Sequence, residues 1–291
     1  MTGRGLRAAL MWSSGKDSAL ALRRAQYEGH EVVRLVTFID SRTERVRFHG
    51  TRRRLLEAQE AAAGIELLAV PIEWSTMGEA LAGVLSGLRS EGIEAIVMGN
   101  VHLADVREWY ESRVRAAGLV HIDPLWGEPP AQLLGEFLDS GGRAVITCVE
   151  RARLSPQWLG REVSRDLLEE SIDPCGENGE YHSFCFLGCG SDRPVPWLAG
   201  VRSPDGNFDL LDLVPASCTG CDRDLVDSDH YLCAICPSAV LCQDCAAGHL
   251  CTPECSARGC LSGLCVKRVG GGRMAEHFGV GGAPTAPAGS A

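Results

Sequence analysis

The first half of the chain alternates short apolar runs with longer segments whose apolar residues recur at helical spacing. Continuous short runs rich in valine and isoleucine are typical of parallel strands that are buried on both faces. The pattern predicts strands at residues 8–12, 32–39, 65–70 and 94–98, and helices from residue 19 and at about 50–63, 77–91 and 105–117. This alternation predicts a doubly wound α/β fold with a parallel sheet, in which ligands bind at the carboxyl ends of the strands.

After residue 120 the pattern is less regular. It predicts a helix at 130–140, a strand at 144–149, a helix at about 160–170, and strand with connecting segments over 191–216. Glycine, proline, alanine and serine dominate from Gly270 onward, which predicts a disordered tail. We therefore expect a main domain at 1–195, a connection at 196–216, a small cysteine-rich module at 217–266 and a tail at 267–291.

A polar loop, Ser13-Ser14-Gly15-Lys16-Asp17-Ser18, joins the first predicted strand to the first predicted helix. Gly15 lets the backbone approach a ligand closely, and the free N–H groups at the start of a helix favour an anion. Lys16 adds a positive charge, and serine hydroxyls are donors for phosphate oxygens. The loop is therefore predicted to bind phosphate. The alternative is a simple helix cap, in which serine and aspartate only satisfy the first turn.

Composition and charge argue against several classes of protein. The chain of 291 residues is 45% hydrophobic and carries a net charge of −10, which argues against general nucleic-acid binding. No apolar stretch reaches the ~18–20 residues of a membrane span, and the N-terminus lacks the apolar core of a signal peptide. We therefore expect a cytoplasmic protein without a membrane partner, and we expect Arg52-Arg53-Arg54 on the solvated face of a helix.

The cysteines are unevenly distributed. Ten of the 14 fall between Cys218 and Cys265, several of them as C-x-x-C pairs. In a reducing compartment such pairs indicate zinc, because two thiolates at this spacing can bind one ion. Disulfides are the alternative.

Three segments together resemble the diphthine–ammonia ligase family. Ser13–Ser18 matches the S-[SG]-G-K-D-S loop of the ATP pyrophosphatases, Gly99–His102 with Arg107 and Glu111 resembles the second motif, and Asp173–His182 resembles the G-E-N-G-E-[FY]-H signature. The resemblance covers about residues 7–190 and implies the HUP-like ATP pyrophosphatase fold.

The resemblance implies ATP-dependent amidation. In this family a carboxylate attacks the α-phosphate of ATP, pyrophosphate leaves, and ammonia displaces AMP from the acyl-adenylate. The implied cofactors are ATP and Mg²⁺, and the implied partners are an acceptor carboxylate and ammonia. The resemblance implies three sets of site residues. The catalytic residues are Lys16, Glu177 and Glu180. The residues that would contact the nucleotide are Ser13, Ser14, Gly15, Lys16, Asp17, Ser18, Gly99 and Asn100, and those that would contact the substrate are His102, Arg107, Glu111, Asn178 and His182.

Several alternatives stay open at this point. The sequence differs from the family at Asn100 and in the segment Phe184–Gly190, so the acceptor need not be diphthine on elongation factor 2. His102 would equally suit a packed histidine, and Glu111 would equally suit the surface of a helix. A nucleotide-binding sensor or scaffold whose zinc module recruits a protein is the alternative to an enzyme.

The cysteine-rich module resembles the ZZ-type zinc finger. By this resemblance Cys218, Cys221, Cys242 and Cys245 hold one Zn²⁺, and Cys233 and Cys236 hold a second together with Cys251 and Cys255. His249 is the alternative to one of the last two ligands, and Cys260 and Cys265 are left without a role. Closed sites of four ligands are structural, so we expect two structural Zn²⁺ ions and a module that binds a peptide or a protein terminus.

Overall fold

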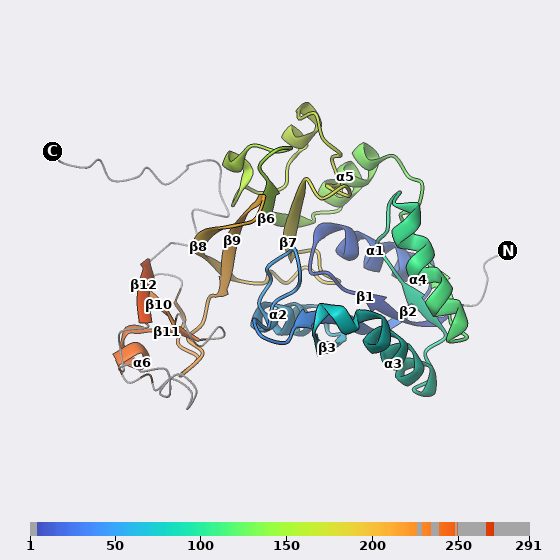
Figure 1. Cartoon of the computed structure of the whole chain (residues 1–291), viewed down its shortest axis with the longest axis horizontal. Helices are drawn as coiled ribbons and strands as arrows, with labels where there is room; N and C mark the ends of the chain where they lie inside the picture. Colours follow the sequence, from blue (N-terminus) through green and yellow to red (C-terminus); the bar gives the residue numbers. More distant parts are fainter. Residues whose placement is uncertain (1–4, 226–228, 234–238, 248, 250–265, 271–291) are drawn as a thin grey trace. The chain divides into compact units, whose positions relative to one another are not determined.

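The computed structural model describes residues 5–225, 229–233, 239–247, 249 and 266–270 (Figure 1). The chain forms two compact units. The first unit comprises residues 1–195 and 199–214, and the second comprises 196–198 and 215–291.

The centre of the first unit is a parallel sheet of five strands. The strands are β1 (Arg7–Met11), β2 (Glu31–Asp40), β3 (Glu66–Ile72), β4 (Ala95–Val97) and β5 (Val120–Ile122), in the order β3-β2-β1-β4-β5. Every neighbouring pair is parallel, and Leu10 of β1 lies in register between Leu35 of β2 and Val97 of β4. The predicted α/β fold is confirmed.

Helices cover both faces of this sheet. The chain runs outward through β2 and β3 and then returns to β4 on the other side of β1. Because such crossovers are right-handed, the helices of the two halves lie on opposite faces. These helices are α1 (Lys16–Tyr27) and α2 (Arg53–Ala63) on one face, and α3 (Met77–Ser90) and α4 (Ala104–Ala116) on the other.

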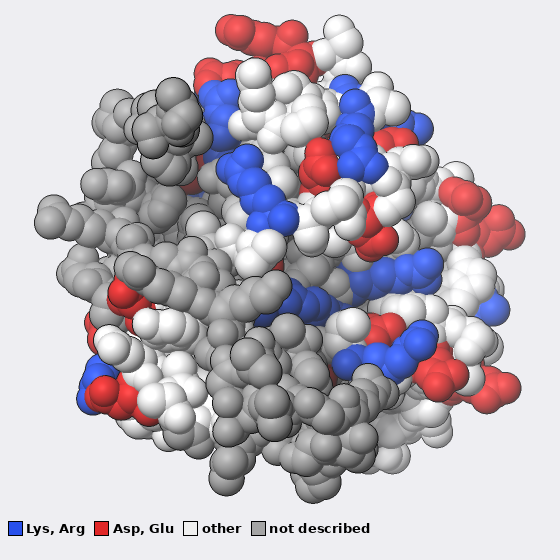
Figure 2. Space-filling view, turned by 60° about the vertical axis from the view of Figure 1, so that its left-hand side comes forward, with Lys and Arg blue, Asp and Glu red and all other residues white. Residues whose placement is uncertain are grey.

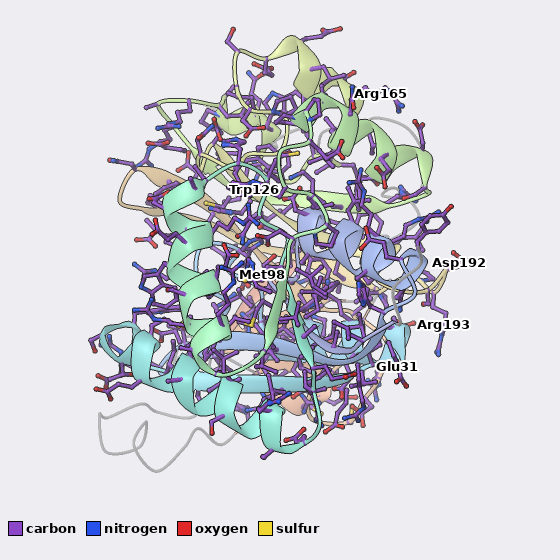
Figure 3. All side chains as sticks on the ribbon, turned by 90° about the vertical axis from the view of Figure 1, so that its right-hand side faces the viewer. Glu31, Met98, Trp126, Arg165, Asp192 and Arg193 are labelled. Atoms are coloured by element: carbon purple, nitrogen blue, oxygen red, sulfur yellow. The ribbon has the colours of Figure 1, made fainter. Side chains whose placement is uncertain are left out.

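The hydrophobic core beneath α3 and α4 follows from the sequence pattern. Leu81, Leu85 and Leu88 recur at helical spacing on α3 and are buried. They pack with strand residues that include Phe38 and Met98, and Figure 3 shows Met98 among closely packed side chains. The reversal of strand order between β1 and β4 leaves a crevice where ligands of such sheets bind.

A second, antiparallel sheet completes the unit. It contains β6 (Arg143–Glu150), β7 (Tyr181–Leu187), β8 (Trp197–Asp205) and β9 (Phe208–Pro215), in the order β7-β6-β9-β8, and follows α5 (Pro130–Asp139). The strand predicted at 144–149 exists, but it belongs to this sheet and does not extend the parallel one.

The helix predicted at about 160–170 is wrong. Residues 160–163 run along β6, where Gly160 N–H donates to Ile146 O and Val163 N–H donates to Ala144 O, both at 2.8 Å. Only short 3₁₀ turns form around this stretch, because its backbone groups are already bonded to the strand. These turns are η2 (Pro156–Trp158) and η3 (Arg165–Glu169); a third, η1 (Trp74–Thr76), precedes α3.

The loop between β2 and α2 is held by a charge cluster. Arg52 donates to Asp212 of β9 from Nε at 3.0 Å and from Nη2 at 2.7 Å, and Arg45 Nη1 donates to the same carboxylate at 2.6 Å. Arg52 is buried, which corrects the expectation that residues 52–54 all lie on a solvated helix face; Arg53 and Arg54 are exposed. On the face shown in Figure 2 the described basic and acidic side chains are intermixed.

The second unit contains a small antiparallel sheet and a short helix. Its elements are β10 (His230–Cys233), β11 (Val240–Leu241), α6 (Gln243–Ala247) and β12 (Val266–Gly270), with strand order β11-β10-β12. The predicted ligands Cys236, Cys251 and Cys255 lie outside the described residues, as do Cys260, Cys265 and the predicted tail beyond residue 270. In the described part of the chain, the helices are too short or too polar to cross a membrane.

The charge cluster generates a stability prediction. Burial would raise the pKa of Asp212, but hydrogen bonds from Arg52 and the charge of Arg45 lower it. The carboxylate therefore stabilises the fold above its unfolded pKa of about 3.9, and this contribution is lost as pH falls through the lower folded pKa. We expect Asp212→Asn to reduce the free energy of unfolding by about 3 kcal/mol in urea titrations at pH 7, because it leaves two arginines without their carboxylate.

Asp209→Asn is the matched control, since Asp209 is on the same strand and pairs with the more exposed Arg151. It should cost less than about 1 kcal/mol. Equal losses for the two variants would contradict the importance of the buried cluster.

Candidate active site

The polar loop after β1 makes a strained turn at Ser14. This residue is buried and has φ of 72°, a left-handed conformation that is rare outside glycine. Its hydroxyl is 2.7 Å from the Thr51 hydroxyl, and its carbonyl accepts from Gln59 Nε2 at 3.1 Å and from Cys185 N–H at 2.8 Å. The surrounding residues therefore fix the turn, which is how strained backbone persists at functional sites.

Lys16 begins α1 and buries its charge. The side chain is 3% exposed, and its ammonium donates to Asp17 Oδ2 at 2.8 Å and to the carbonyl of Cys175 at 2.5 Å. It also lies 4.9 Å from the centre of the Tyr181 ring. Burial alone would lower the pKa of the ammonium, but the interactions with Asp17, Tyr181 and Cys175 together outweigh it and hold the pKa of Lys16 well above its usual value. The site thus contains a permanent positive charge.

The end of β4 packs directly on the first turn of α1. A Cβ atom at Gly99 would lie 3.1 Å from the backbone carbonyl of Asp17 and 3.2 Å from the nitrogen of Ser18. A side chain at this position would have to push the backbone of α1 away, and its absence lets the second predicted motif pack against the first.

The loop at 173–182 folds back on itself through Gly176. This glycine has φ of 70°, and a Cβ atom there would lie 2.7 Å from the carbonyl oxygen of Tyr181. Glu180 is buried and its Oε1 accepts from the backbone N–H of Asp173 at 3.3 Å and from Asn178 Nδ2 at 3.2 Å. Glu180 and Asn178 therefore hold the loop in shape.

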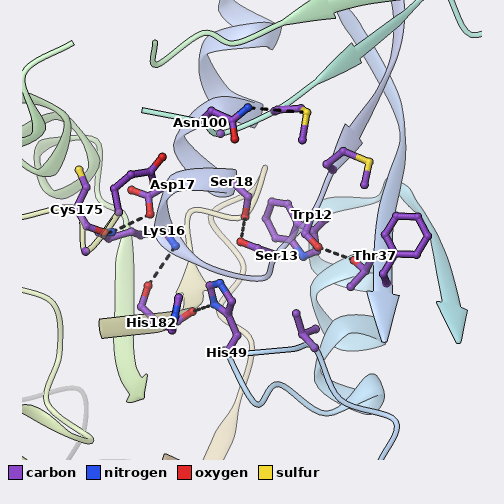
Figure 4. Close-up of a pocket in the computed structure, with 18 of the residues that line it drawn as sticks. Trp12, Ser13, Lys16, Asp17, Ser18, Thr37, His49, Asn100, Cys175 and His182 are labelled. Atoms are coloured by element: carbon purple, nitrogen blue, oxygen red, sulfur yellow. Dashed lines mark hydrogen bonds and ion pairs between the residues drawn. The ribbon is translucent and has the colours of Figure 1, made fainter. Parts of the chain in front are cut away.

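A pocket of about 300 Å³ lies where these loops meet, at the carboxyl ends of β1, β2 and β4 (Figure 4). This is the crevice expected at the reversal of strand order. The structure brings together on its wall many of the predicted site residues: Ser13, Lys16, Asp17, Ser18, Gly99, Asn100, Glu177 and His182.

Other predicted site residues lie away from the pocket wall. His102 Nε2 is 2.7 Å from Asp173 Oδ2, and Arg107 pairs with Asp123 at 3.1 Å and with Glu111 at 3.7 Å. Ser14, Gly15, Asn178 and Glu180 also do not line the pocket. The roles assigned to these residues in ligand binding stay predictions.

Asn100 connects the pocket to a buried carboxylate. Its Nδ2 donates to Asp123 Oδ1 at 3.0 Å. Burial raises the pKa of Asp123 to about 6, although the Asn100 hydrogen bond and the charge of Arg107 oppose the rise. The orientation of the Asn100 side chain at the pocket is therefore set by a group outside the pocket.

Glu177 presents a carboxylate to the pocket. Its Oε1 accepts from the backbone N–H of Val101 at 3.0 Å. Burial raises the pKa of Glu177, and the charge of Asp17 raises it further. Its second carboxylate oxygen makes no hydrogen bond to the described residues, so Glu177 can exchange a proton with a bound ligand.

Sequence reasoning missed a histidine. His49, from the loop after β2, lines the pocket 4.8 Å from His182 between ring centres. Its Nδ1 lies 2.8 Å from the Ser183 carbonyl, which can only accept, so Nδ1 carries the proton and Nε2 is free to accept. Burial lowers the pKa of both histidines, which favours the neutral form of each ring. A loop histidine without a motif gives no sequence signal.

Apolar pocket residues were also missed. Met11, Val36, Phe38, Met77 and Met98 line one part of the wall. Val36 and Phe38 lie within β2, while the three methionines lie at or next to the end of a strand or the start of a helix, and sequence shows all five only as core positions. Together with the polar loops they make a pocket with one apolar side, suited to a flat base, and one side rich in donors, suited to phosphate.

In the second unit, Cys218, Cys221, Cys242 and Cys245 form a metal-binding arrangement. All four sulfur atoms lie within 4.8 Å of one another, and Cys221 Sγ is 3.8 Å from Cys242 Sγ. Tetrahedral Zn²⁺ with bonds of about 2.3 Å requires sulfur separations of about 3.8 Å, so these residues fit zinc. They are the four that the resemblance assigned to one ion.

Backbone donors make Cys218 a good ligand. The N–H groups of Cys242 and Gly220 donate to its sulfur at 3.3 and 3.4 Å. Burial would raise the pKa of the thiol, but these hydrogen bonds outweigh it and lower the pKa of Cys218 to about 6. The thiolate form that zinc needs is therefore favoured.

The fold and the pocket define an α/β protein with a phosphate-suited loop at its topological switch point. Residues 6–121 match the family described as Diphthamide synthase N-terminal domain. The diphthine–ammonia ligase of Rattus norvegicus is 26% identical over 208 residues, which span 62% of this chain and 78% of the rat protein. The chain is thus homologous to a ligase that forms carbon–nitrogen bonds.

The loop geometry generates a prediction for Gly176. We expect Gly176→Ala to lower the free energy of unfolding measured in urea titrations. The positive φ alone should cost about 1–2 kcal/mol, and the clash of the new Cβ atom with Tyr181 should add to this loss. Gly179→Ala is the matched control, because Gly179 has φ of 87° and its Cβ would meet nothing within 4 Å. Equal losses for the two variants would show that the close approach to Tyr181 is not maintained.

Proposed function

We propose that this chain is an ATP-dependent amide ligase. It adenylates a carboxylate and then transfers ammonia to it, releasing AMP and pyrophosphate. The rat relative is named for diphthine and ammonia. We propose the same pair of substrates here. The observation that carries the proposal is the buried ammonium of Lys16 at the pocket formed by the Ser13–Ser18 loop, β4 and the 173–182 loop.

The proposed reaction places negative charge on the leaving pyrophosphate. One acceptor oxygen bonds to the α-phosphorus, and the bond from that phosphorus to the bridging oxygen breaks, so its electron pair leaves with pyrophosphate. Lys16 and the hydroxyls of Ser13 and Ser18 are the donors that would stabilise this charge, and their fixed positions are what makes such stabilisation effective.

Mg²⁺ is the proposed companion of ATP. Asp17 is a carboxylate on the pocket wall, and it fits the oxygen ligands that Mg²⁺ takes together with substrate phosphates. When bound, the ion would neutralise phosphate charge.

The second step needs a neutral amine. Ammonia attacks the acyl carbon, AMP leaves with the electron pair of the acyl–oxygen bond, and a base removes one proton from nitrogen. We assign the proton to the free carboxylate oxygen of Glu177 or to His49 Nε2, both at the pocket. Glu180 then has a positioning role through its contacts in the loop.

Lys16 provides the decisive test. We expect Lys16→Met to lower AMP formation from ATP, ammonium and diphthine-bearing elongation factor 2 by about 10²–10³-fold, because the variant keeps side-chain volume but removes a preorganised charge. AMP is measured by chromatography. Arg23→Met, on the exposed face of the same helix, should retain activity. Formation of ADP in place of AMP, or an active Lys16→Met variant, would overturn the proposal.

For the second unit we propose two structural Zn²⁺ ions. One of them is held by Cys218, Cys221, Cys242 and Cys245. We propose that the partner of this unit is a peptide or a protein terminus. Removing one of four ligands strongly weakens a tetrahedral site. We therefore expect Cys242→Ser to lower the zinc content by about one ion per chain, as measured by inductively coupled plasma emission spectroscopy. Cys148→Ser, a buried cysteine of the first unit, should leave the zinc content unchanged. Equal zinc in the wild type and Cys242→Ser would exclude this site.

A further inference from the structure

We propose that a second cavity beside the nucleotide pocket binds the acceptor, and that Arg47 pairs with the acceptor's carboxylate. The inference rests on the proposed function and extends it, because it assigns a binding site and a specificity residue for the substrate that is adenylated.

The second cavity lies within the first unit and has a volume of about 540 Å³. Its wall comes from the loop after β2, from Trp74, from Cys148 of β6 and from the turn between β8 and β9. Val46 and Trp74 line both this cavity and the nucleotide pocket. The two cavities therefore adjoin, and a molecule bound in one lies next to a ligand bound in the other, which suits a two-substrate reaction.

The guanidinium of Arg47 is held in position by aromatic rings and is available to bind a ligand. Its guanidinium lies 4.8 Å from the centre of the Phe48 ring and 4.9 Å from that of Trp74. The guanidinium has no hydrogen bond or ion pair to any of the described residues, whereas those of Arg45 and Arg52 in the same loop both pair with Asp212. The loop is thus fixed by Arg45 and Arg52, and it offers Arg47 to the cavity.

Phe48, which packs against Arg47, has a strained backbone and an exposed aromatic ring. It has φ of 65°, an outlier for a bulky residue, and its side chain is 53% exposed. Its ring stacks on His182 of the nucleotide pocket, at 5.6 Å between centres and 22° between planes. Neither strain nor exposure benefits folding, and both are explained if the ring holds Arg47 and contacts the acceptor.

The chemistry of the reaction fits this placement. A guanidinium orients a carboxylate through paired hydrogen bonds, leaving one oxygen free to attack the α-phosphorus. Amidation replaces the charged carboxylate by a neutral amide, so the ion pair with Arg47 is lost in the product. The same residue that binds the acceptor therefore allows the product to leave.

The acceptor is accordingly a carboxylate on a side chain with an apolar or planar body that packs on Trp74 and Phe208, both on the cavity wall. Residues of the Ser13–Ser18 loop line the nucleotide pocket and not this cavity. The two substrates thus occupy neighbouring cavities.

The test separates binding of the carboxylate from binding of the rest of the acceptor. With diphthine-bearing elongation factor 2 as the probe, we expect Arg47→Ala to raise the acceptor KM by about 10–100-fold, the range for a lost hydrogen bond to a charged group, and to leave the KM for ATP unchanged. Arg47→Lys should recover part of the loss. Affinity for the amidated product should not change, because the amide has no charge to pair.

Arg42→Ala is the matched control, since Arg42 is an exposed arginine of the same loop that does not line the cavity. An unchanged acceptor KM in Arg47→Ala, or an equal loss of affinity for acceptor and product, would overturn the inference while leaving the ligase function intact. If the wild type binds no ATP and forms no AMP with this probe, the proposed function fails and the inference fails with it.

Discussion

The buried ammonium of Lys16 is the interaction on which the site depends. A charge that is 3% exposed is costly unless it is paired, and here Asp17 and the carbonyl of Cys175 pair with it. Asp17 belongs to the first turn of α1, and Cys175 belongs to a loop more than 150 residues later in the chain. The ammonium therefore joins two distant segments, and the pocket can form only when both are in place.

The antiparallel sheet is as important for the pocket as the parallel one. β7 supplies His182 and Ser183 to the pocket wall, and its Cys185 N–H bonds the carbonyl of Ser14. Gln59 of α2 links the loop after β1 to β7. Its amide nitrogen donates to the carbonyls of both Ser14 and Cys185, and its amide oxygen accepts from Trp12 Nε1. The phosphate-suited loop is thus held between two sheets, which fixes its donors in advance of any ligand.

The sequence predicts the parts of the structure that have local causes. Alternating buried strands and helices indicate the parallel sheet, and the polar loop at Ser13–Ser18 indicates its ligand-binding edge. Two C-x-x-C pairs also indicate the sulfur cluster, because the spacing itself sets the ligand geometry. The second sheet was not foreseen, since antiparallel pairing of β6 with β7 and β9 depends on distant partners. His49 and Arg47 were missed for the same reason: tertiary contacts alone bring the loop after β2 to the pocket.

The wall shared by the two cavities has an evolutionary consequence. The nucleotide pocket is built on strand ends and on the start of α1, whereas the neighbouring cavity is lined mainly by the loop after β2 and by the turn at Asp205–Phe208. Surface segments of this kind tolerate insertion and substitution far better than a sheet does. Under the proposed function, drift in those segments would change the acceptor while adenylation persists, which would let one scaffold diversify within a lineage.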